Sequence, residues 1–344
     1  MKSIPTLRRI AIAVAALALC AGAQAAPQCG SDKPLRFAGI TWESGQFYTS
    51  LIRTILESGY GCKTEVVNGS TAATETALVS GDLQLWVEQW NRTDIIKKGV
   101  EGGKIKLVGD LLADGGATEG FFVPDYVVNG DAKRGIEASA PDLRTVADMP
   151  KYKELFADDE ELGKGRFLNC PTGWDCEKIN NQKFKAYKLD SSYTNFRAGT
   201  GSALDAAVSS AVERGKPVLF YYWSPASLMG KYKFVQIKEP DYNQKCWETI
   251  KDPRAKEVCP SATPNSRLTV GMSTALIQSD PEVVSLIEKV QVKPETINAS
   301  IARMAGEKKV PADVVTKEFL KANPAVWSAW VTPAAAAKLT EALK

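Results

Sequence analysis

The sequence predicts an α/β fold in two lobes, and three observations lead to this expectation. Apolar strand-like runs alternate with helical segments over residues 35–88, which is the pattern of a mainly parallel sheet flanked by helices. The chain of 344 residues is longer than a single domain usually is. Tryptophans also stand just beyond predicted strands, at the edge where such sheets bind ligands. We therefore expect two such lobes with a ligand cleft between them.

The first lobe begins with a strand at 35–41, which leads into a loop at Trp42. Apolar residues at three-to-four spacing over 47–56 predict the next helix, and Gly59 and Gly61 end it. The other elements predicted before the first crossing are a strand at 63–67, a helix at 70–80, and strands at 83–88, 105–111 and 121–124.

The second lobe is expected over residues 125–233, so the first lobe is discontinuous and comprises 26–124 and 234–344. The elements predicted in the second lobe are helices at 151–156, 177–189 and 202–214 and a strand at 217–222. The returning chain is expected to carry a polar surface excursion at 241–267, a strand at 268–275, and helices at 281–290, 293–305, 311–323 and from 333 onward.

Residues 1–25 have the pattern of a secretory signal peptide. A basic start precedes a short apolar run at 10–21, and Ala-Gln-Ala at 23–25 is a cleavage signal, so the mature chain is expected to begin near Ala26. The apolar run is too short for a membrane anchor. A lipoprotein signal fits poorly, because a leucine precedes the cysteine of this region. We expect export to the periplasm.

Cysteine usage supports an exported protein. Removing the signal peptide removes Cys20, and six of the seven cysteines remain. An even number in an exported chain indicates disulfides, for which fifteen pairings exist. Proximity along the chain favours two pairs and leaves a third: Cys170–Cys176, Cys246–Cys259 and Cys29–Cys62. The alternative of a zinc site is unfavourable, because the chain has no histidine and no C-x-x-C pair.

The absence of histidine also limits the chemistry. It excludes Ser-His and Cys-His catalysis, and the chain has no phosphate-binding loop, dinucleotide fingerprint or nucleophile elbow. The 43 basic residues nearly balance the 40 acidic ones, so no basic surface for nucleic acid is expected. We expect no enzyme and no bound metal or cofactor, although a carboxylate-based enzyme stays formally open because Asp and Glu are plentiful.

Tryptophans in loops are the most informative side chains. Trp90 follows a strand in VEQWNRT, Trp174 lies inside the short Cys170–Cys176 loop, and Trp223 ends the strand of FYYWSP. Trp42 stands at the end of the first strand. Rigid, partly exposed indoles can hold a cation against their faces. A tryptophan taken at random is more often part of a core or interface, but these loop positions favour a ligand site.

Three segments carry a resemblance to a known family: FLNCPTGWDCEKIN, GKPVLFYYWSP and GATEGFFVP. With them, the chain resembles the periplasmic substrate-binding proteins of ABC importers for glycine betaine, proline betaine and choline over nearly its whole mature length. The resemblance implies a type II periplasmic-binding-protein fold and a monomer that closes on a small cationic or zwitterionic ligand and presents it to a membrane permease.

The resemblance also implies roles for particular residues. By motif, Trp90, Trp174 and Trp223 box the quaternary ammonium of the ligand. The backbone amides of Asp175 and Cys176 take up the ligand's carboxylate. This role suits a helix N-terminus, where backbone N–H groups are unpaired and an anion is stabilised.

Acidic residues mark where the chain departs from the family pattern. Asp94 stands where a histidine helps to bind the carboxylate, and Glu119 stands where a glutamine is usual. Glu43 adds an acid beside Trp42, while Arg92 could supply a compensating donor. Either these acids contact a ligand that carries less negative charge than betaine, as choline does, or one with a second cationic group, or they are solvated loop carboxylates.

Two other functions stay open. A binder of a guanidinium or amino-acid ligand would prefer arginine-like compounds over trimethylated ones. A protein of a different class, a secreted carbohydrate-binding protein or glycosidase, would use indoles to stack on sugar rings. A glycosidase needs two carboxylates that face the cleft, and Glu43, Glu119 and Asp94 could supply them.

Overall fold

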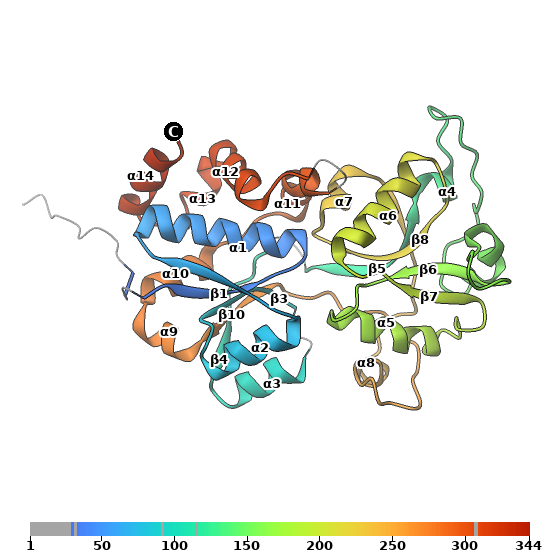
Figure 1. Ribbon diagram of the computed structural model, residues 1–344, viewed down its shortest axis with the longest axis horizontal. Helices are drawn as coiled ribbons and strands as arrows, with labels where there is room; N and C mark the ends of the chain where they lie inside the picture. The colour runs from blue at the N-terminus through green and yellow to red at the C-terminus, as the bar shows by residue number, and fades with distance from the viewer. Residues whose placement is uncertain (1–28, 31–32, 91–92, 114–115, 306–308) are drawn as a thin grey trace, which may run out of the picture.

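Two lobes lie side by side in the computed structural model, which describes residues 29–30, 33–90, 93–113, 116–305 and 309–344 (Figure 1). Each lobe contains a five-stranded sheet, with the strand orders β2-β1-β3-β10-β4 and β7-β6-β8-β5-β9. Helices flank both sheets, so the predicted two-lobed α/β fold is confirmed. The predicted signal peptide lies outside the described residues.

The first sheet consists of β1 (Leu35–Gly39), β2 (Thr64–Asn68), β3 (Leu85–Gln89), β4 (Ile105–Val108) and β10 (Thr269–Ser273). β1 runs parallel to β2 and β3, because a helix connects each consecutive pair of these strands. β10 returns from the other lobe and pairs antiparallel with β3 and β4. The sheet is therefore mixed, with one parallel half and one antiparallel half.

Helix α1 (Glu43–Ile55) covers one face of the first sheet (Figure 1). Phe47, Leu51 and Ile55 are spaced four residues apart and are completely buried, which explains why this segment forms an amphipathic helix. A single π-helical turn (Leu56–Tyr60) extends the helix, and Gly61 ends it with the left-handed φ of 75° that glycine adopts without strain.

The remaining helices of the first lobe complete the layers. α2 (Thr71–Ser80) and α3 (Asp94–Glu101) cover the face opposite α1 (Figure 1). The C-terminal part of the chain adds α9 (Thr274–Ser279), α10 (Pro281–Lys289), α11 (Pro294–Ile301), a 3-10 turn (Ala302–Met304), α12 (Ala312–Ala322), α13 (Pro324–Trp327) and α14 (Pro333–Ala342). No described helix has the length and apolar character needed to cross a membrane.

The second lobe repeats the plan of the first. Its strands are β5 (Thr118–Pro124), β6 (Gly165–Asn169), β7 (Tyr193–Arg197), β8 (Leu219–Ser224) and β9 (Phe234–Ile237). Its helices are α4 (Asp125–Asn129), a 3-10 segment (Met149–Phe156), α5 (Asp175–Ala186), α6 (Gly201–Glu213), α7 (Ser227–Lys231) and α8 (Gln244–Lys251). β6 is parallel to β7 and β8, whereas β5 is antiparallel to β8 and β9.

The lobe boundaries differ from the prediction. β5 pairs with β8 from Thr118 opposite Ser224 to Phe122 opposite Phe220, and β9 pairs with β5. Both strands therefore belong to the second sheet, although the sequence placed 121–124 and 234–237 in the first lobe. The chain crosses between the sheets before β5 and after β9. An apolar run shows that a strand exists but carries no information about its partner, which explains the error.

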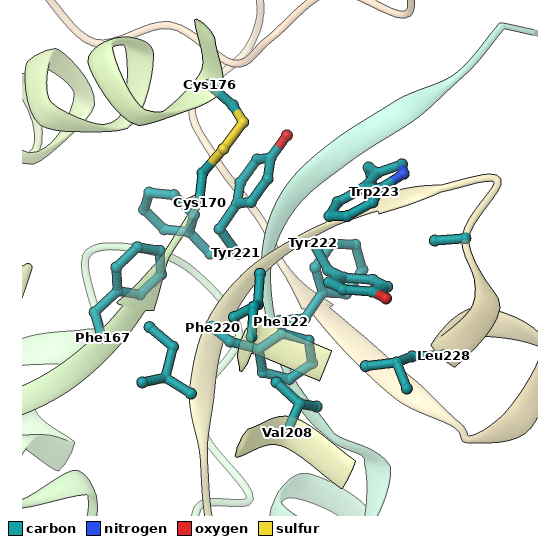
Figure 2. Packing of buried hydrophobic residues seen from close by; sticks show 14 of the residues in the cluster. Phe122, Phe167, Cys170, Cys176, Val208, Phe220, Tyr221, Tyr222, Trp223 and Leu228 are labelled. Atoms are coloured by element: carbon teal, nitrogen blue, oxygen red, sulfur yellow. A yellow bond between two sulfur atoms is a disulfide. The ribbon is translucent and has the colours of Figure 1, made fainter. Parts of the chain in front are cut away.

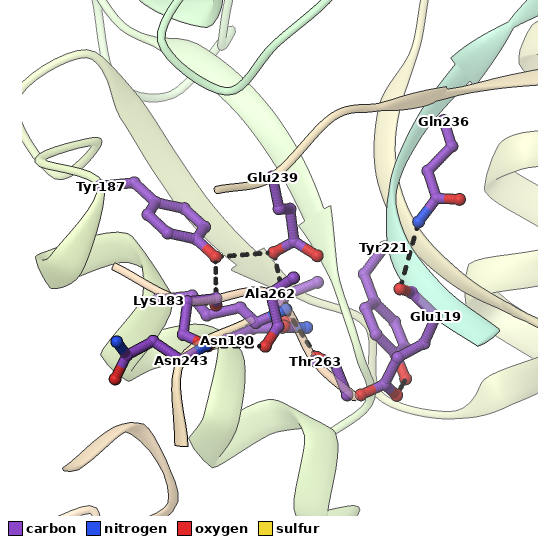
Figure 3. A network of polar contacts seen from close by, with 12 residues as sticks. Glu119, Asn180, Lys183, Tyr187, Tyr221, Gln236, Glu239, Asn243, Ala262 and Thr263 are labelled. Atoms are coloured by element: carbon purple, nitrogen blue, oxygen red, sulfur yellow. Dashed lines mark hydrogen bonds and ion pairs between the residues drawn. The ribbon is translucent and has the colours of Figure 1, made fainter. Parts of the chain in front are cut away.

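The polar excursion at 241–267 also packs on the second lobe (Figure 3). Lys183 of α5 donates a hydrogen bond of 2.7 Å to Thr263 Oγ1, and Tyr187 donates one of 2.6 Å to the carbonyl oxygen of Ser261. Trp247 of α8 packs in a small apolar cluster on α5. These contacts hold most of the excursion against α5 of the second lobe, whereas the sequence placed it in the first lobe.

Three disulfides are present: Cys29–Cys62, Cys170–Cys176 and Cys246–Cys259. Two of them are the pairs favoured by proximity along the chain, and the third joins the two cysteines that remain. Cys170–Cys176 closes the loop between β6 and α5, beside the aromatic core of the second lobe (Figure 2). This loop carries Trp174, so the disulfide restricts the position of one of the predicted ligand-binding side chains.

Candidate ligand-binding pocket

The predicted indoles all stand at the carboxyl ends of parallel strands. Trp42 follows β1 and precedes α1, and Trp90 directly follows β3. In the other lobe Trp174 precedes α5 after β6, and Trp223 is the penultimate residue of β8. The two sheets turn these ends toward each other, which places residues from both lobes around one pocket.

The pocket encloses about 510 Å³ of space, its open mouth included, a size typical of small-molecule sites. Its described lining consists of five tryptophans and eight other residues, most of them polar: Trp42, Trp86, Trp90, Trp174, Trp223, Tyr221, Thr71, Glu75, Gln89, Thr93, Glu119, Asp175 and Cys176. The predicted residues Trp42, Trp90, Trp174, Trp223, Glu119, Asp175 and Cys176 are thus brought together.

Trp174 connects the aromatic surfaces of the two lobes. Its ring centroid lies 5.4 Å from that of Trp42 at an interplanar angle of 70°, and 5.4 Å from that of Trp223 at 75°. These edge-to-face contacts match the preferred geometry of aromatic pairs. Trp174 Nε1 also donates a hydrogen bond of 3.0 Å to Thr41 Oγ1 of the first lobe. Both lobes therefore contact the same half-buried indole.

The second-lobe wall is the side of the pocket that β8, β5 and the loop before α5 supply, and the alternation of side chains along a strand explains which residues of β8 form it. Along β8, Tyr221 and Trp223 point to one side and Phe220 to the other, as Figure 2 shows. Tyr221 and Trp223 line the pocket, while Phe220 packs in the core of the lobe. Glu119 lies opposite Trp223 in the β5–β8 pairing and reaches the pocket from the neighbouring strand.

Trp42, Trp86 and Trp90 form the side of the pocket that belongs to the first lobe, called here the first-lobe wall. A buried carboxyl group holds two of these indoles. Glu88 Oε1 accepts hydrogen bonds from Trp42 Nε1 at 2.7 Å and from Trp90 Nε1 at 3.2 Å. Trp86 donates its ring N–H to Thr74 Oγ1 at 2.9 Å. Each first-lobe indole of the pocket thus has a hydrogen-bond acceptor for its ring nitrogen, which restricts its orientation.

Acidic side chains form part of the polar wall. Glu75 is buried and accepts hydrogen bonds from Gln89 Nε2 at 3.0 Å and Thr93 Oγ1 at 2.7 Å. Burial raises the pKa of Glu75 to about 7, against the lowering effect of these hydrogen bonds. Glu119 is also buried, and its carboxylate accepts a hydrogen bond from the Tyr221 hydroxyl (Figure 3).

The N-terminus of α5 faces the same pocket. Asp175 and Cys176 are its first two residues and line the pocket, and Trp174 occupies the N-cap position without a side-chain hydrogen bond to the helix. The backbone N–H groups of a first helical turn attract a negatively charged or polar acceptor group. The acidic side chain of Asp175 opposes this attraction, so the site is less suited to an anion than the backbone alone suggests.

Two predicted residues do not reach the pocket. Glu43 is buried beside α6, and burial followed by its hydrogen bond with the Asp205 carboxyl raises the pKa of Glu43 well above its ordinary value. Asp94 is the exposed first residue of α3 and is not part of the described lining. Each residue of a helix is rotated by about 100° from the previous one, so neighbours of a lining residue point elsewhere. Arg92 lies outside the described residues.

The sequence did not identify six residues of the described lining, which are Trp86, Tyr221, Glu75, Thr71, Gln89 and Thr93, nor Glu88, which holds two of the indoles. Tyr221 carries a usable signal, since it is two residues from Trp223 on the same strand and must share its face. Trp86 lies inside the predicted strand 83–88, where an apolar residue gives no sign that its ring reaches a pocket. The two glutamates have no local signal, because their positions depend on contacts with residues that are distant in sequence or on the far side of a turn.

The two-lobed fold and the aromatic pocket between the sheets define a class, that of substrate-binding proteins that hold a small molecule between two domains. Residues 33–322 match the OpuAC family, described as the substrate binding domain of ABC-type glycine betaine transport systems. This match covers most of the chain, and the chain belongs to that family. It is a substrate-binding protein of the ABC-type glycine betaine transport family.

Curated relatives agree with the family. The chain is 25% identical over 269 residues to the glycine betaine/proline betaine-binding periplasmic protein of Escherichia coli, covering 76% of this chain and 78% of the relative. It is also 25% identical over 300 residues to the trimethylamine N-oxide-binding protein of Pelagibacter ubique, covering 87% and 90%.

Solved structures show the same fold. An ABC-transporter choline binding protein in complex with choline has a TM-score of 0.67 at 18% identity, covering 92% of this chain and 99% of that protein. Lactococcal OpuAC in its closed-liganded conformation with glycine betaine has a TM-score of 0.65 at 14% identity, covering 88% and 100%. The similarity of fold extends over both lobes.

Proposed function

We propose that this protein is an exported, monomeric receptor that binds a small quaternary or trimethylated ammonium compound between its lobes and presents it to the permease of an ABC importer. The observation that carries the proposal is the convergence of indoles from both lobes on one pocket. A methylated ammonium has no N–H donor, so its recognition depends on shape and on the π-faces of aromatic rings. The relative from Escherichia coli is named a periplasmic protein, which supports export to the same compartment.

The free energies of cation–π contacts show how much of the binding the pocket indoles can account for. A desolvated cation–π contact is worth about 2 kcal/mol, so three contacts supply roughly 6 kcal/mol. Micromolar affinity corresponds to about 8 kcal/mol, and closing the lobes on a ligand adds an ordering cost. Burial of the methyl groups supplies part of the remainder. The polar end of the ligand must supply the rest and therefore decides which compound binds most tightly.

The polar wall favours ligands without a carboxylate. Glu75 and Glu119 place two carboxyl groups in the lining, and Asp175 adds a third at the start of α5. A helix N-terminus offers roughly half a positive charge, which is less than the negative charge of even one ionised carboxylate. We therefore rank choline and trimethylamine N-oxide above glycine betaine. The hydroxyl of choline can donate to a carboxylate, and the N-oxide oxygen can accept from a protonated one.

A binding screen tests the proposal. The chain from Ala26 onward is titrated with choline, trimethylamine N-oxide, glycine betaine, arginine and maltose by calorimetry and thermal shift. We expect micromolar binding of the first two compounds with a change in tryptophan fluorescence, and about tenfold weaker binding of glycine betaine, equivalent to about 1.4 kcal/mol. Binding of arginine or maltose, with no response to any trimethylated compound, would contradict the proposal.

Matched tryptophan variants localise the signal. Trp90→Ala removes a pocket indole worth about 2 kcal/mol, so it should weaken choline binding about 30-fold and reduce the thermal shift accordingly. Trp330 is buried in the core of the first lobe and does not belong to the pocket lining, so Trp330→Phe should keep choline binding. Loss of binding in both variants would mean that the response reports general stability instead of pocket occupancy.

A further inference from the structure

The backbone at Glu88 is unusual for a strand. Its φ is 60°, in the left-handed region that a non-glycine residue rarely adopts. The pairing of β3 with β10 also shifts here, because Trp86 lies opposite Gly271 whereas Gln89 lies opposite Thr269. Two residues of β3 therefore oppose one residue of β10, which defines a β-bulge. Bulges often re-aim side chains beside functional sites, and such a strained conformation is a reason to look for a function.

The side chain that this bulge re-aims is fully buried. Glu88 Oε1 accepts three hydrogen bonds, from Trp42 Nε1 at 2.7 Å, Ser44 Oγ at 2.9 Å and Trp90 Nε1 at 3.2 Å. Glu88 Oε2 is buried and has no hydrogen-bond partner among the described residues. One carboxyl group thus contacts two indoles of the pocket, one that follows β1 and one that follows β3. Its second oxygen makes no hydrogen bond to a described residue and can carry a proton.

We propose that Glu88 is a positioning residue of the pocket, which orients the Trp42 and Trp90 rings through their N–H groups and strengthens cation binding by its negative charge. This inference rests on the proposed function. An anion at the ring N–H increases the electron density on the ring faces, and those faces attract the cation. Glu88 does not belong to the described lining of the pocket, so it acts through the rings.

The titration of Glu88 gives this role a measurable sign. Burial raises the pKa of Glu88 to about 8, against the lowering effect of its three hydrogen bonds. A bound cation stabilises the ionised carboxylate, so binding should release a proton and become tighter as the pH rises through 8. Tyr48 of α1 is a titratable group beside Glu88, and burial, followed by the Glu88 and Asp110 charges, raises the pKa of Tyr48. The other glutamates to consider are Glu75, which bonds the neighbouring Gln89, and Glu119 of the second lobe, and both line the pocket.

Glu88→Gln tests the proposal, because an amide oxygen can still accept from the indoles while the charge is removed. Tetramethylammonium is the probe, since it has no titratable group and no polar end. For wild type we expect affinity to rise about sixfold from pH 6.5 to 8.5 if the cation lowers the pKa of Glu88 by one unit. In Glu88→Gln this sixfold rise should disappear. Glu65→Gln, an exposed carboxyl of the same lobe, is the matched control.

A measurement without ligand separates this inference from the proposed function. Protonation of a carboxyl that is hydrogen-bonded to two indoles should change tryptophan fluorescence, with a midpoint near pH 8 in wild type and no such transition in Glu88→Gln. Ser44→Ala removes a donor that stabilises the ionised carboxylate, so the midpoint should move to higher pH. This variant decides the question if Glu88→Gln does not fold.

The outcomes are distinct. Loss of the fluorescence transition and of the pH-dependent rise in affinity in Glu88→Gln supports the proposal. Binding of tetramethylammonium by Glu88→Gln with the wild-type pH profile overturns it, as does a fluorescence transition that survives the substitution. Failure of wild type to bind any trimethylated compound overturns the proposed function and the cation-binding role together, whereas the ligand-free titration still shows whether Glu88 holds the two rings.

Discussion

The two walls of the pocket hold their indoles by different means. In the first lobe, Trp42 and Trp90 donate their ring N–H groups to one buried carboxyl, Glu88. In the second lobe, the Cys170–Cys176 disulfide closes the loop that carries Trp174, and the pairing of β8 with β5 positions Trp223, whose ring N–H has no partner among the described residues. One wall therefore depends on a titratable group and the other on covalent and strand geometry, so changes of pH and of redox state should act on different lobes.

The largest expected effect is at the indole that both walls share. Trp174→Ala removes one cation–π face and the edge contacts with Trp42 and Trp223, which together are worth about 3 kcal/mol. We expect choline affinity, measured by calorimetry, to fall about 100-fold. The side chain is half-buried, so the melting temperature without ligand should change little. A collapse of that temperature would show that Trp174 is part of the core.

The second-lobe wall is tested by its disulfide. Replacing both Cys170 and Cys176 with Ser should lower the free energy of unfolding by about 2 kcal/mol, from the size of the closed loop. Because the loop carries Trp174, choline affinity should also fall, by about tenfold. Serine at both Cys246 and Cys259 is the control: it opens a somewhat larger loop in the excursion and should cost similar stability with no loss of affinity. Equal affinities in the two double variants would show that the wall needs no covalent support.

The first-lobe wall is tested by pH. The pKa of Glu75 is about 7 when folded, against an ordinary value of 4.5, so the folded protein binds more protons than the unfolded chain between these values. The stability from this group is complete below pH 4.5 and is lost as the pH rises through 7. Between pH 5 and 7 the loss should be about 1–2 kcal/mol. Thermal unfolding of Glu75→Gln should show a correspondingly flatter pH profile; an unchanged profile would mean that Glu75 is not buried in solution.

The smallest expected effect concerns the contact between the lobes. Thr41→Ala removes the acceptor of the Trp174 ring N–H, a half-exposed hydrogen bond worth about 0.5–1 kcal/mol. Choline affinity should fall two- to fivefold by calorimetry, because the bond holds both lobes against the same indole. Thr76 makes a similar exposed hydrogen bond within α2, so Thr76→Ala serves as the control and should leave affinity unchanged. No change in Thr41→Ala would show that the rings alone align the lobes.

The pocket could be predicted from the sequence to the extent that its residues stand at recognisable strand ends. Trp90, Trp174 and Trp223 follow apolar runs, and their common edge follows from parallel pairing. Glu88 could not be found in this way. Its side-chain direction results from a bulge against β10, which lies about 180 residues further along the chain. The face that a strand residue occupies depends on such pairing, and a single unpaired residue reverses it.

The same dependence on the pairing strand explains why the lobe boundaries were predicted wrongly. Residues 121–124 and 234–237 are apolar enough to predict strands, yet only their hydrogen bonds show that both belong to the second sheet. Glu43 shows that a position next to a pocket residue does not by itself predict a pocket residue. It directly follows the pocket residue Trp42, but the first turn of α1 directs its carboxyl toward Asp205 of α6. Adjacent residues at a helix start therefore need not share a site.

The central claim is that indoles from both lobes form one pocket that recognises positive charge, and a pair of isosteric ligands tests it most directly. Choline and 3,3-dimethyl-1-butanol have the same shape and hydroxyl group, but only choline is charged. The account predicts that choline binds on the order of 100-fold more tightly in calorimetric titrations, since only a cation gains from the ring faces. Equal affinities for the two compounds would show that the pocket recognises apolar shape alone and would contradict the account.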